Sequence, residues 1–397
     1  MGCPREEEVL TSVQPIYLDN AATTPVDPAV LDAMLPYFRE RFGNAASHHH
    51  RWGWEAEEAV EVAREETARL IGAEPREVVF TSGATESNNL ALKGVLARHA
   101  PDGGRIVTSP MEHHSVLDVV EHLAARGFRR EMLPVDETGC VVIDRLESHL
   151  AAPTVLVSVQ HVNNETGVIQ PVAEIGRRCK EHGVLFHVDG TQAAGKLPIS
   201  VNEIGADLYA LSGHKIYGPK GIGALYLRRR APRVRPIPLL DGGGHERGLR
   251  SGTLNVPGAV GLGAAARLAA ERGEDENLRW ARQRDRLESG LQELDGVLIH
   301  GRAAPRAGNI SNVGFRGLTA EALLGQLHTL AVSTGSACTS GSLEPSHVLR
   351  AMRVDEKIAR ASLRFSLGRF TTGDEVETAI RVVQETVVRL RHAVAAS

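Results

Sequence analysis

Cysteine is scarce in this sequence of 397 residues, and its placement argues against two common uses of the residue. The four cysteines, Cys3, Cys140, Cys179 and Cys338, are scattered without any CxxC spacing. Zinc sites and disulfide frameworks use cysteines at characteristic spacings. We therefore expect no metal site and no disulfide framework, and we expect a reducing compartment in which a single cysteine can act as a free thiol.

Long apolar runs and an excess of one charge are also missing. No apolar run approaches the ~20 residues that a membrane-spanning helix needs, and the formal net charge is only -4. Such a balance provides no basic field for nucleic acid. The acidic segment 1–8 resembles neither a signal peptide nor an organelle presequence. We expect a cytoplasmic protein that binds small molecules or other proteins, and neither nucleic acid nor membrane.

Strand-like and helix-like patterns alternate through the first two thirds of the sequence. Amphipathic stretches such as 56–71, 115–126 and 172–182 separate short apolar runs. This alternation predicts an α/β fold with a mostly parallel sheet covered on both faces, and ligands bind such sheets outside the carboxyl ends of the strands. The strand-like runs are 78–81, 105–108, 154–159, 184–188, 208–211 and 223–227.

A charged segment, 271–277, follows an alanine-rich stretch and indicates a change of domain. After it, long helical runs over 278–294 and 374–394 surround strand-like pieces at 310–313 and 363–366. This pattern is typical of a smaller α+β domain. We predict a large domain over 16–270 and a small domain formed by 1–15 and 271–397.

A lysine follows the apolar run 208–211 after a short polar turn. Lys215 ends the sequence Ser212-Gly213-His214-Lys215. An ammonium group is costly to bury unless the protein uses it. A Schiff base with pyridoxal 5'-phosphate would explain the lysine, and this chemistry also needs a carboxylate for the pyridinium nitrogen and hydroxyls or backbone amides for the phosphate. The sequence offers a candidate for each.

The candidate carboxylate is Asp189, just past the end of the run 184–188. A carboxylate there can keep the pyridine nitrogen protonated, which makes the ring an electron sink. A helix cap or turn aspartate is the commoner use of such a residue. Because Lys215 follows the next strand, the cofactor role is favoured here.

The candidate phosphate site is the turn in 80–89, where a strand-like run meets a helix start. Gly83 lets the backbone approach a ligand closely, Thr85 adds a hydroxyl, and free amides at a helix start bind phosphate. Plain helix capping by Thr81 or Ser82 is the alternative. The segment is not a P-loop, because no GxxxxGK[ST] motif occurs.

The sequence contains two histidine clusters. His113 follows the run 105–108, and an imidazole can stack on a pyridine ring and move protons near neutral pH. A surface or metal-binding pair with His114 is the alternative, but adjacent side chains on an extended segment point to opposite faces. The cluster His48-His49-His50 lacks a ligand pattern, and we interpret it as structural or surface.

Cys338 lies among small and polar residues in the segment 332–342, which is typical of a loop. Structural cysteines usually have apolar neighbours. A loop thiol can reach a substrate and carry a group away. Cys140 in a turn and Cys179 on a helix are predicted to be passive, and Cys3 belongs to the terminus.

Arg364 alternates with apolar residues in the run 363–366. A guanidinium that points inward needs a carboxylate, which an α-amino acid substrate could supply in bidentate geometry. A structural salt bridge is an equally good interpretation of this residue taken alone.

These residues together resemble the cysteine desulfurases, a group within the class V aminotransferase family of pyridoxal phosphate enzymes. The resemblance runs from Ile16 to Thr372, nearly the whole chain. The loop 335–340 is similar to the long-loop group that supplies general or nitrogenase-linked iron–sulfur assembly. Besides Asp189, Lys215 and Cys338, the most specific matches are Thr81-Ser82-Gly83-Ala84-Thr85-Glu86-Ser87-Asn88, His161-Val162-Asn163-Asn164-Glu165-Thr166-Gly167, Gly242-Gly243-Gly244-His245-Glu246-Arg247 and Arg250-Ser251-Gly252-Thr253.

The resemblance implies a fold type I enzyme with a seven-stranded sheet that works as a homodimer with shared sites. It implies conversion of L-cysteine to L-alanine, a persulfide on a catalytic cysteine, and an iron–sulfur scaffold or other acceptor protein. The resemblance implies that Lys215 binds the cofactor and removes the α-proton, that Cys338 is the nucleophile, and that His113 stacks on the ring near the substrate thiol proton. For the cofactor it implies Asp189 at the pyridinium nitrogen, Asn164 and Gln192 at the phenolic oxygen, Ala84, Thr85, Ser212 and His214 at the phosphate, and Thr253 at the phosphate of the neighbouring subunit. For the substrate carboxylate it implies Arg364, assisted by Asn164.

Other functions fit the same residues. A selenocysteine lyase or another amino-acid lyase would use the same cofactor but release product without storing sulfur on Cys338. A protein that keeps the fold only as an interaction module is disfavoured, because lysine, acid and thiol are all present. The sequence ends at Ser397, whereas housekeeping members that it resembles have a longer tail that docks the scaffold protein. The identity of the sulfur acceptor therefore stays open. A nitrogenase-type or specialised member is one interpretation.

Overall fold

A seven-stranded sheet forms the centre of the protein. The computed structural model describes residues 15–230, 233–335 and 345–395. In the sheet, of order β2-β8-β7-β6-β5-β3-β4, only β8 runs against its neighbours, so the predicted α/β class and mostly parallel seven-stranded sheet are confirmed. Its strands are β2 (Val78–Thr81), β3 (Arg105–Thr108), β4 (Arg129–Met132), β5 (Thr154–Gln160), β6 (Leu185–Asp189), β7 (Leu208–Ser212) and β8 (Gly223–Leu227).

The apolar runs of the sequence predicted every strand of this sheet except β4. The strands β2, β3 and β8 have the predicted bounds, and β5, β6 and β7 differ by a residue at one or both ends. Strand β4 lies at the edge of the sheet, where it pairs with β3 alone. It begins Arg-Arg-Glu and is largely exposed. An edge strand of charged residues has no apolar run to reveal it.

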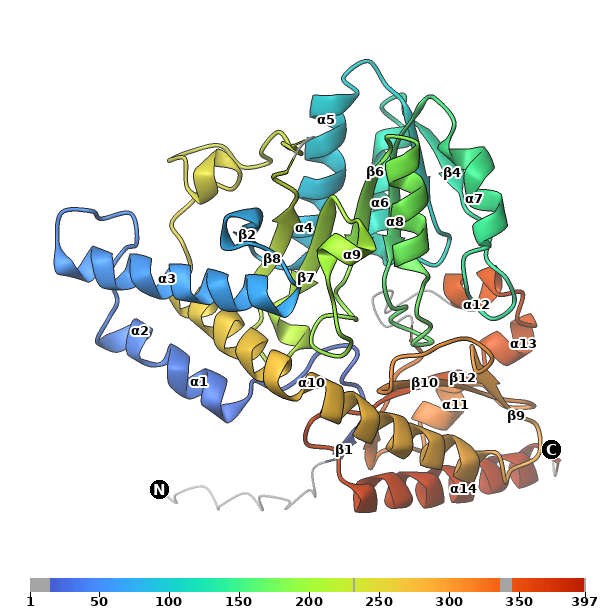
Figure 1. The fold of residues 1–397 in the computed structure, drawn as a ribbon. Helices are drawn as coiled ribbons and strands as arrows, with labels where there is room; N and C mark the ends of the chain where they lie inside the picture. Colours follow the sequence, from blue (N-terminus) through green and yellow to red (C-terminus); the bar gives the residue numbers. More distant parts are fainter. Residues whose placement is uncertain (1–14, 231–232, 336–344, 396–397) are drawn as a thin grey trace, which may run out of the picture.

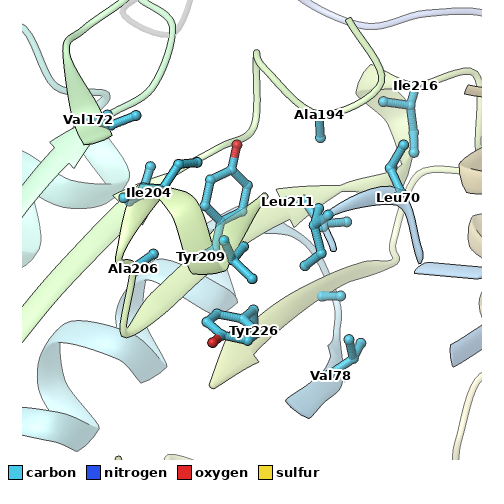
Figure 2. Close-up of a cluster of buried hydrophobic side chains, with 14 of the residues drawn as sticks. Leu70, Val78, Val172, Ala194, Ile204, Ala206, Tyr209, Leu211, Ile216 and Tyr226 are labelled. Atoms are coloured by element: carbon cyan, nitrogen blue, oxygen red, sulfur yellow. The ribbon is translucent and has the colours of Figure 1, made fainter. Parts of the chain in front are cut away.

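Helices cover both faces of the sheet (Figure 1). One face packs on α3 (Arg51–Leu70), α8 (Val172–Glu181) and the first half of α10 (Val256–Leu291), where Tyr209 and Leu211 of β7 are fully buried (Figure 2). Leu208 and Ala210, which alternate with them, pack on the opposite face. That face is covered by α6 (His114–Ala124) and by a helical run formed by α4 (Ala84–Asn89), a π-helical turn (Leu90–Gly94) and α5 (Val95–His99).

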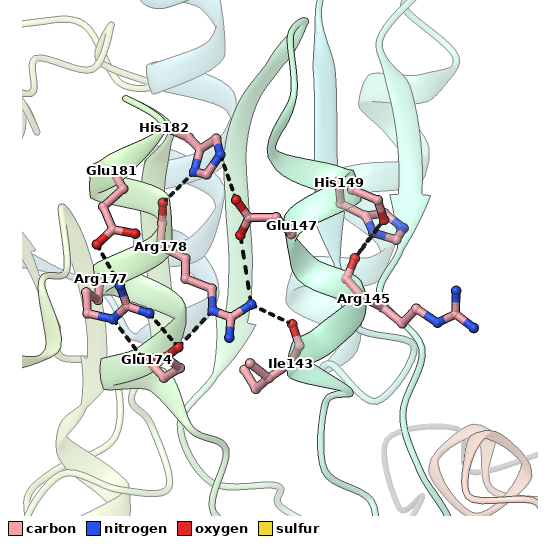
Figure 3. Close-up of polar contacts among 10 residues, drawn as sticks. Ile143, Arg145, Glu147, His149, Glu174, Arg177, Arg178, Glu181 and His182 are labelled. Atoms are coloured by element: carbon pink, nitrogen blue, oxygen red, sulfur yellow. Dashed lines mark hydrogen bonds and ion pairs between the residues drawn. The ribbon is translucent and has the colours of Figure 1, made fainter.

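The outer surface of α7 (Ile143–Leu150) and α8 is held by charged side chains rather than apolar packing. Arg178 of α8 contacts Glu174 on its own helix and Glu147 on α7, and Glu147 also contacts His182 (Figure 3). These pairs are largely exposed, so each contributes little to stability. They link two neighbouring helices at the surface.

A second structural layer is built from the C-terminal part of the chain. An antiparallel sheet of order β12-β10-β9 packs with α10 and α14 (Gly373–Ala395) around Trp280, Phe315 and Phe365. A separate two-stranded parallel sheet joins β1 to β11. The strands are β1 (Ile16–Tyr17), β9 (Val297–His300), β10 (Ile310–Phe315), β11 (Leu330–Ala331) and β12 (Ser362–Ser366).

Helix α10 connects the two parts of the molecule. Its first half packs against α3 and against α1 (Pro28–Met34), and its second half against α14 (Figure 1). A Cβ atom at Gly263 would lie 2.5 Å from the Cα atom of Ala63, so glycine allows α10 and α3 to approach closely. The charged segment 271–277, where we predicted a change of domain, lies inside this continuous helix.

Short helices complete the fold. Within the described ranges, no helix combines the length and apolarity needed to cross a membrane. The remaining α-helices are α2 (Pro36–Arg39), α9 (Val201–Ile204), α11 (Ala320–Leu324), α12 (His347–Ala351) and α13 (Glu356–Ala359).

Candidate active site

The carboxyl ends of the parallel strands bring the predicted site residues to one edge of the sheet. Strand β6 ends at Asp189, and β7 ends at Ser212, where a 3-10 turn carries Lys215. Strand β2, at the other side of β8, ends at Thr81 and leads into the turn at Gly83. Side chains that are far apart in the sequence therefore face one space.

That space is a cavity of about 640 Å³. Its wall combines both structural layers, because Arg364 of β12 faces it together with the strand ends of the large sheet. Most of the predicted site residues line it, namely Ala84, Thr85, His113, Asn164, Asp189, Gln192, Ser212, His214, Lys215 and Arg364. The structure thus brings together residues that the sequence presented as separate motifs.

Lys215 is half-buried at the cavity wall. Its Nζ atom donates hydrogen bonds to the carbonyl oxygens of Ala21 (2.6 Å) and Ala22 (2.7 Å). The segment that follows β1 thus holds the amine at the cavity wall, and the preceding backbone is fixed because the amide of Gly213 donates to the carbonyl of Ile222. The amine is therefore well placed to react with a carbonyl group in the cavity.

Asp189 is buried at the end of β6, and both of its carboxylate oxygens accept hydrogen bonds. The backbone amide of Thr191 donates to Oδ1 (3.0 Å), and Nδ2 of Asn88 donates to Oδ2 (2.9 Å). Asn88 also donates to the hydroxyl of Ser115 (2.9 Å). Sequence analysis quoted Asn88 only as part of a motif and missed its role as the partner that orients Asp189. Its position four residues after Ala84, on the same helical face, is a signal that could have indicated it.

The predicted phosphate end of the cavity lies at the start of the helical run on α4. Gly83 has a φ of 149°, a conformation that other residues rarely adopt, and it places the first helical amides of Ala84 and Thr85 at the cavity. The first amides of a helix have no partner within the helix and bind anions readily. The hydroxyl of Ser212 lies 3.8 Å from an ideal Cβ position on Gly83, so it belongs to the same corner.

His113 caps α6 and lines the cavity. Its Nδ1 atom accepts a hydrogen bond from the backbone amide of Ser115 (3.0 Å). Burial lowers the pKa of the imidazole, although Asp189 acts in the opposite direction. The ring is therefore neutral near neutral pH, which suits both stacking on an aromatic ring and acceptance of a proton.

His214 has a similar electrostatic setting. Its Nδ1 atom lies 3.1 Å from the hydroxyl oxygen of Thr23. Burial first, and the nearby charge of Lys215 second, lower the pKa of His214 to about 4. The imidazole is therefore neutral and can act as a hydrogen-bond donor in the cavity without adding charge.

Arg364 is almost fully buried and already has a carboxylate partner. Its Nη2 atom contacts Oδ1 of Asp19 (2.7 Å), and its Nη1 atom donates to the carbonyl oxygen of Asn164 (2.9 Å). Among the residues that the structure describes, its buried Nε atom has no hydrogen-bond partner. The structural ion pair is therefore present, and the role of Arg364 at a substrate carboxylate stays a prediction. Sequence analysis missed the part played by Asp19.

Gln192 is held from two sides. Its Nε2 atom donates to the carbonyl of Ala21 (2.8 Å), and its Oε1 atom accepts from Nζ of Lys196 (3.2 Å). Lys196 is 3% exposed, and sequence analysis did not single it out. Because Oε1 accepts from the amine of Lys196, the NH2 group of Gln192 faces Ala21 at the cavity wall.

One described site residue of the prediction lies outside this cluster. Thr253 is exposed and does not line the cavity of the single chain. Cys338 lies outside the described residues. Burial raises the pKa of both Cys140 and Cys179, so these thiols stay protonated near neutral pH. Within the described ranges, no three His, Cys, Asp or Glu side chains gather in a way that could hold a metal ion.

Comparisons with known proteins show to which family the chain is similar. The family described as Aminotransferase class-V matches residues 16–378. The chain is 54% identical to "Cysteine desulfurase IscS" of Anaeromyxobacter sp. (strain Fw109-5) over 95% of this chain and 93% of the relative. It is 50% identical to "Cysteine desulfurase IscS" of Salmonella schwarzengrund (strain CVM19633) over 95% of this chain and 94% of that relative.

Solved structures give the same result. A structure described as a NifS-like protein superposes with a TM-score of 0.87 at 38% identity, and the match covers 94% of this chain and all of that one, 100%. DndA from Streptomyces lividans superposes with a TM-score of 0.75 at 42% identity, covering 88% of this chain and 99% of the other.

The chain belongs to the class V aminotransferase family. Within that family it is a cysteine desulfurase, a pyridoxal phosphate enzyme that serves sulfur supply. The recognition made from the sequence motifs, and the cofactor that the motifs implied, are thereby confirmed.

The residues of the cavity fit pyridoxal phosphate. The amine of Lys215 and the carboxylate of Asp189 stand at neighbouring strand ends of the same cavity, and the helix start after Gly83 offers amides for a phosphate. The unpartnered Nε atom of Arg364 marks a further place where an anionic group would satisfy a buried donor.

Proposed function

We propose that the enzyme takes sulfur from L-cysteine, stores it as a persulfide on Cys338 and releases L-alanine. The observation that carries this proposal is the cavity in which Lys215, Asp189 and Arg364 meet. It provides an amine, an acid and a carboxylate receptor for an α-amino acid. Cys338 is assigned from its sequence setting.

Lys215 is the group that would hold the cofactor and remove the α-proton of the substrate. The bound cofactor supplies an electron sink for the charge that develops on the α-carbon. Asp189, fixed by Asn88, would keep the pyridine nitrogen protonated. Gln192 and Asn164 would donate to the phenolic oxygen, and His113 would cover the ring.

Arg364 would bind the carboxylate of the substrate. Its Nε atom is free to donate among the described residues, and the ion pair with Asp19 orients the guanidinium. A bidentate contact would require one substrate oxygen to accept from Nε and the other from a terminal nitrogen. The Asp19 carboxylate therefore competes with the substrate for the same cation and would loosen product binding.

The proposed sulfur transfer needs no external oxidant. The thiolate of Cys338 attacks the substrate sulfur, an S–S bond forms and the C–S bond breaks. The electron pair of the C–S bond stays with the substrate carbon, which takes a proton and leaves as alanine. His113, neutral at working pH, would accept the proton of the substrate thiol.

A homodimer with shared sites is part of the proposal. Thr253 is exposed in the single chain, where it is free to reach a neighbouring subunit's phosphate. Large aromatic side chains near α2 and α3 are also exposed, Phe42 by 66% and Trp54 by 55%. We further propose a cytoplasmic location and an acceptor protein, either an iron–sulfur scaffold or another sulfur acceptor.

Mass spectrometry of the enzyme after exposure to L-cysteine tests the proposal. We expect a gain of one sulfur atom on the peptide that contains Cys338, and none on those with Cys140 or Cys179, whose raised pKa values make them internal controls. Addition of candidate acceptor proteins should remove the adduct in favour of one of them. Full cysteine turnover by a Cys338→Ala variant would contradict the persulfide step and favour a lyase that releases sulfur directly.

A further inference from the structure

A row of three hydrogen bonds joins two lysine amines across the wall of the cavity. Nζ of Lys196 donates to Oε1 of Gln192 at 3.2 Å, and Nε2 of Gln192 donates to the carbonyl oxygen of Ala21 at 2.8 Å. The same carbonyl oxygen accepts from Nζ of Lys215 at 2.6 Å. Gln192, Ala21 and Lys215 line the cavity, whereas Lys196 is buried and does not line it. The amide of Gln192 is therefore held between a buried amine and the carbonyl that also holds Lys215.

The backbone on both sides of this row is fixed. Lys196 and Gln192 belong to the turn that follows β6, in which the amide of Lys196 donates to the carbonyl oxygen of Ala193 at 3.0 Å. Ala21 is held from the other structural layer, because its amide donates to the hydroxyl of Ser366 on β12 at 2.8 Å. The side chain of Gln192 therefore bridges two segments whose backbones are anchored separately.

Lys196 is costly at this place unless its N–H bonds are used. Among the described hydrogen bonds, its amine contacts two oxygens of Gln192, namely Oε1 and the backbone carbonyl oxygen at 3.1 Å. Neither of these partners is charged, and burial lowers the pKa of Lys196 from 10.5 to about 7. An apolar side chain would avoid the cost of burying an amine. The presence of lysine is explained if its hydrogen bond to Gln192 serves the site.

The amine determines which way the Gln192 amide points. A carboxamide has an acceptor, Oε1, on one side and a donor, the NH2 group, on the other. Reversal of the amide would place Oε1 against the carbonyl oxygen of Ala21 and the NH2 group against the amine of Lys196, so two hydrogen bonds would be lost. The NH2 group has two N–H bonds, of which Ala21 takes one. The arrangement therefore presents an N–H donor, rather than an oxygen, to the cavity.

We propose that Lys196 is a positioning residue for the cofactor, because it holds the amide of Gln192 so that the NH2 group donates to the phenolic oxygen of pyridoxal phosphate. The inference rests on the proposed function, which places Gln192 at that oxygen. A phenolate oxygen is negatively charged, and a donor that is held towards it binds it more strongly than one that must first be ordered. Lys196 does not line the cavity, so its effect passes through Gln192.

The test measures how tightly the full-length apoenzyme binds two ligands, in wild type and in a Lys196→Met variant. The first ligand is pyridoxal phosphate, and the second is an analogue in which hydrogen replaces the phenolic oxygen. Equilibrium titration followed by absorbance gives both affinities. We expect Lys196→Met to weaken the binding of pyridoxal phosphate about tenfold, since a hydrogen bond to a charged acceptor typically contributes about that factor. Binding of the analogue should equal that of wild type within error, because the analogue has no oxygen to receive the donor.

Further variants show whether Lys196 acts through Gln192. Gln192→Met removes the amide and should weaken the binding of pyridoxal phosphate at least as much as Lys196→Met does. In the double variant, Lys196→Met should add less than about twofold to that loss, because two residues that act through one contact are not additive. Lys196→Leu, which is also apolar, decides the question should Lys196→Met not fold.

Arg302→Met is the matched control. The Nη1 atom of Arg302 donates to Oε1 of Gln292, so this variant also removes a cationic donor from a glutamine oxygen. Both residues are exposed and lie away from the cavity. Arg302→Met should leave the affinity for both ligands unchanged.

Other outcomes overturn the inference. Unchanged binding of pyridoxal phosphate by Lys196→Met would show that Gln192 keeps its orientation without the amine. An equal loss for both ligands would show that Lys196 supports the cavity as a whole rather than a donor to one oxygen. Wild-type affinity in Gln192→Met would instead overturn the placement of Gln192 at the phenolic oxygen, which belongs to the proposed function. Sulfur transfer to Cys338 plays no part in these titrations, so the persulfide step and the role of Lys196 can fail separately.

Discussion

Lys196 lies in an environment that is unfavourable for a charged amine. Its ammonium is buried and contacts only the carbonyl oxygen (3.1 Å) and side-chain oxygen (3.2 Å) of Gln192 among the described hydrogen bonds. Burial, with a smaller effect of Lys215, lowers its pKa from 10.5 to about 7. The unfolded chain therefore binds more protons than the folded one between these pH values.

This difference predicts a pH dependence of stability. Because unfolding takes up a proton in this range and free protons become scarcer at higher pH, the free energy of unfolding rises as pH increases from about 7 towards 10.5. Wild type should therefore gain stability between pH 7 and pH 9 relative to a Lys196→Met variant, which lacks the titrating group. Urea unfolding at both pH values measures this, with exposed Lys180→Met as the control. A stability difference between wild type and Lys196→Met that stays constant with pH would contradict it.

Asn88 supports the site through a single hydrogen bond to Asp189. An Asn88→Ala variant leaves Oδ2 of Asp189 without this donor, so the carboxylate is less firmly oriented towards the pyridine nitrogen. Because partners that orient a binding group commonly contribute 10- to 100-fold in affinity, we expect pyridoxal phosphate to bind about tenfold more weakly. Titration of the apoenzyme, followed by cofactor absorbance, measures the affinity.

A matched asparagine serves as the control for this experiment. Asn202 is exposed, and its Nδ2 atom donates to the carbonyl of Gly72 at 3.0 Å, away from the cavity. Asn202→Ala should leave the cofactor affinity unchanged. Equal affinities for Asn88→Ala and wild type would show that Asp189 keeps its orientation without Asn88.

At the scale of elements, the junction between α10 and the segment after β12 depends on one buried arginine. Arg369 pairs with Glu276 of α10 (2.7 Å) and with Asp27, the cap of α1 (2.8 Å). Its guanidinium also lies 4.2 Å from the ring centroid of Tyr217. Removal of the arginine would leave two buried carboxylates without their cation.

Arg369→Met should therefore be strongly destabilising. Breaking a buried ion pair by removing one partner costs about 3–5 kcal/mol. Arg286 is the matched control, because it makes a similar two-pronged contact with Glu377 on an exposed surface between α10 and α14. Arg286→Met should change stability little, since water solvates the remaining charge. Similar thermal unfolding of both variants would contradict the prediction.

At the scale of the whole molecule, one surface exposes a cluster of aromatic side chains. Phe42 stacks on Trp52 with ring centroids 4.9 Å apart, and both side chains are largely exposed, as is Trp54. Clustered exposed aromatic side chains typically mark an interface. This surface lies beside α3, on the part of the molecule that carries the large sheet (Figure 1).

We expect this surface to hold two copies of the chain together. Sedimentation velocity should show a dimer for wild type and a shift towards monomer for Phe42→Asp, because a charge buried in an apolar interface is costly. Leu278→Asp changes a similarly exposed apolar residue on α10 and should remain dimeric. Dimers of unchanged stability in Phe42→Asp would place the interface elsewhere.

Some residues of the candidate site could be predicted from the sequence, and others could not. Lys215, Asp189 and His113 each follow a short apolar run, and a residue in that position of a parallel sheet faces the ligand edge. Asn88 and Asp19 gave no such signal, because each acts through a partner that lies 101 and 345 positions away. Strand β4 was missed for a similar reason, since a charged edge strand is defined by pairing with β3 rather than by its own residues.

The sequence by itself determined the alternation of strands and helices, the fold class and the chemical groups available at the strand ends. These depend on local periodicity and on residue types, which neighbouring positions set. Only the tertiary structure decided that Arg364 pairs with Asp19 while it lines the cavity, and that Lys196 is buried beside Gln192. Such contacts join residues from separate layers, and burial, which sets the energy of every charge among them, exists only once the chain has folded.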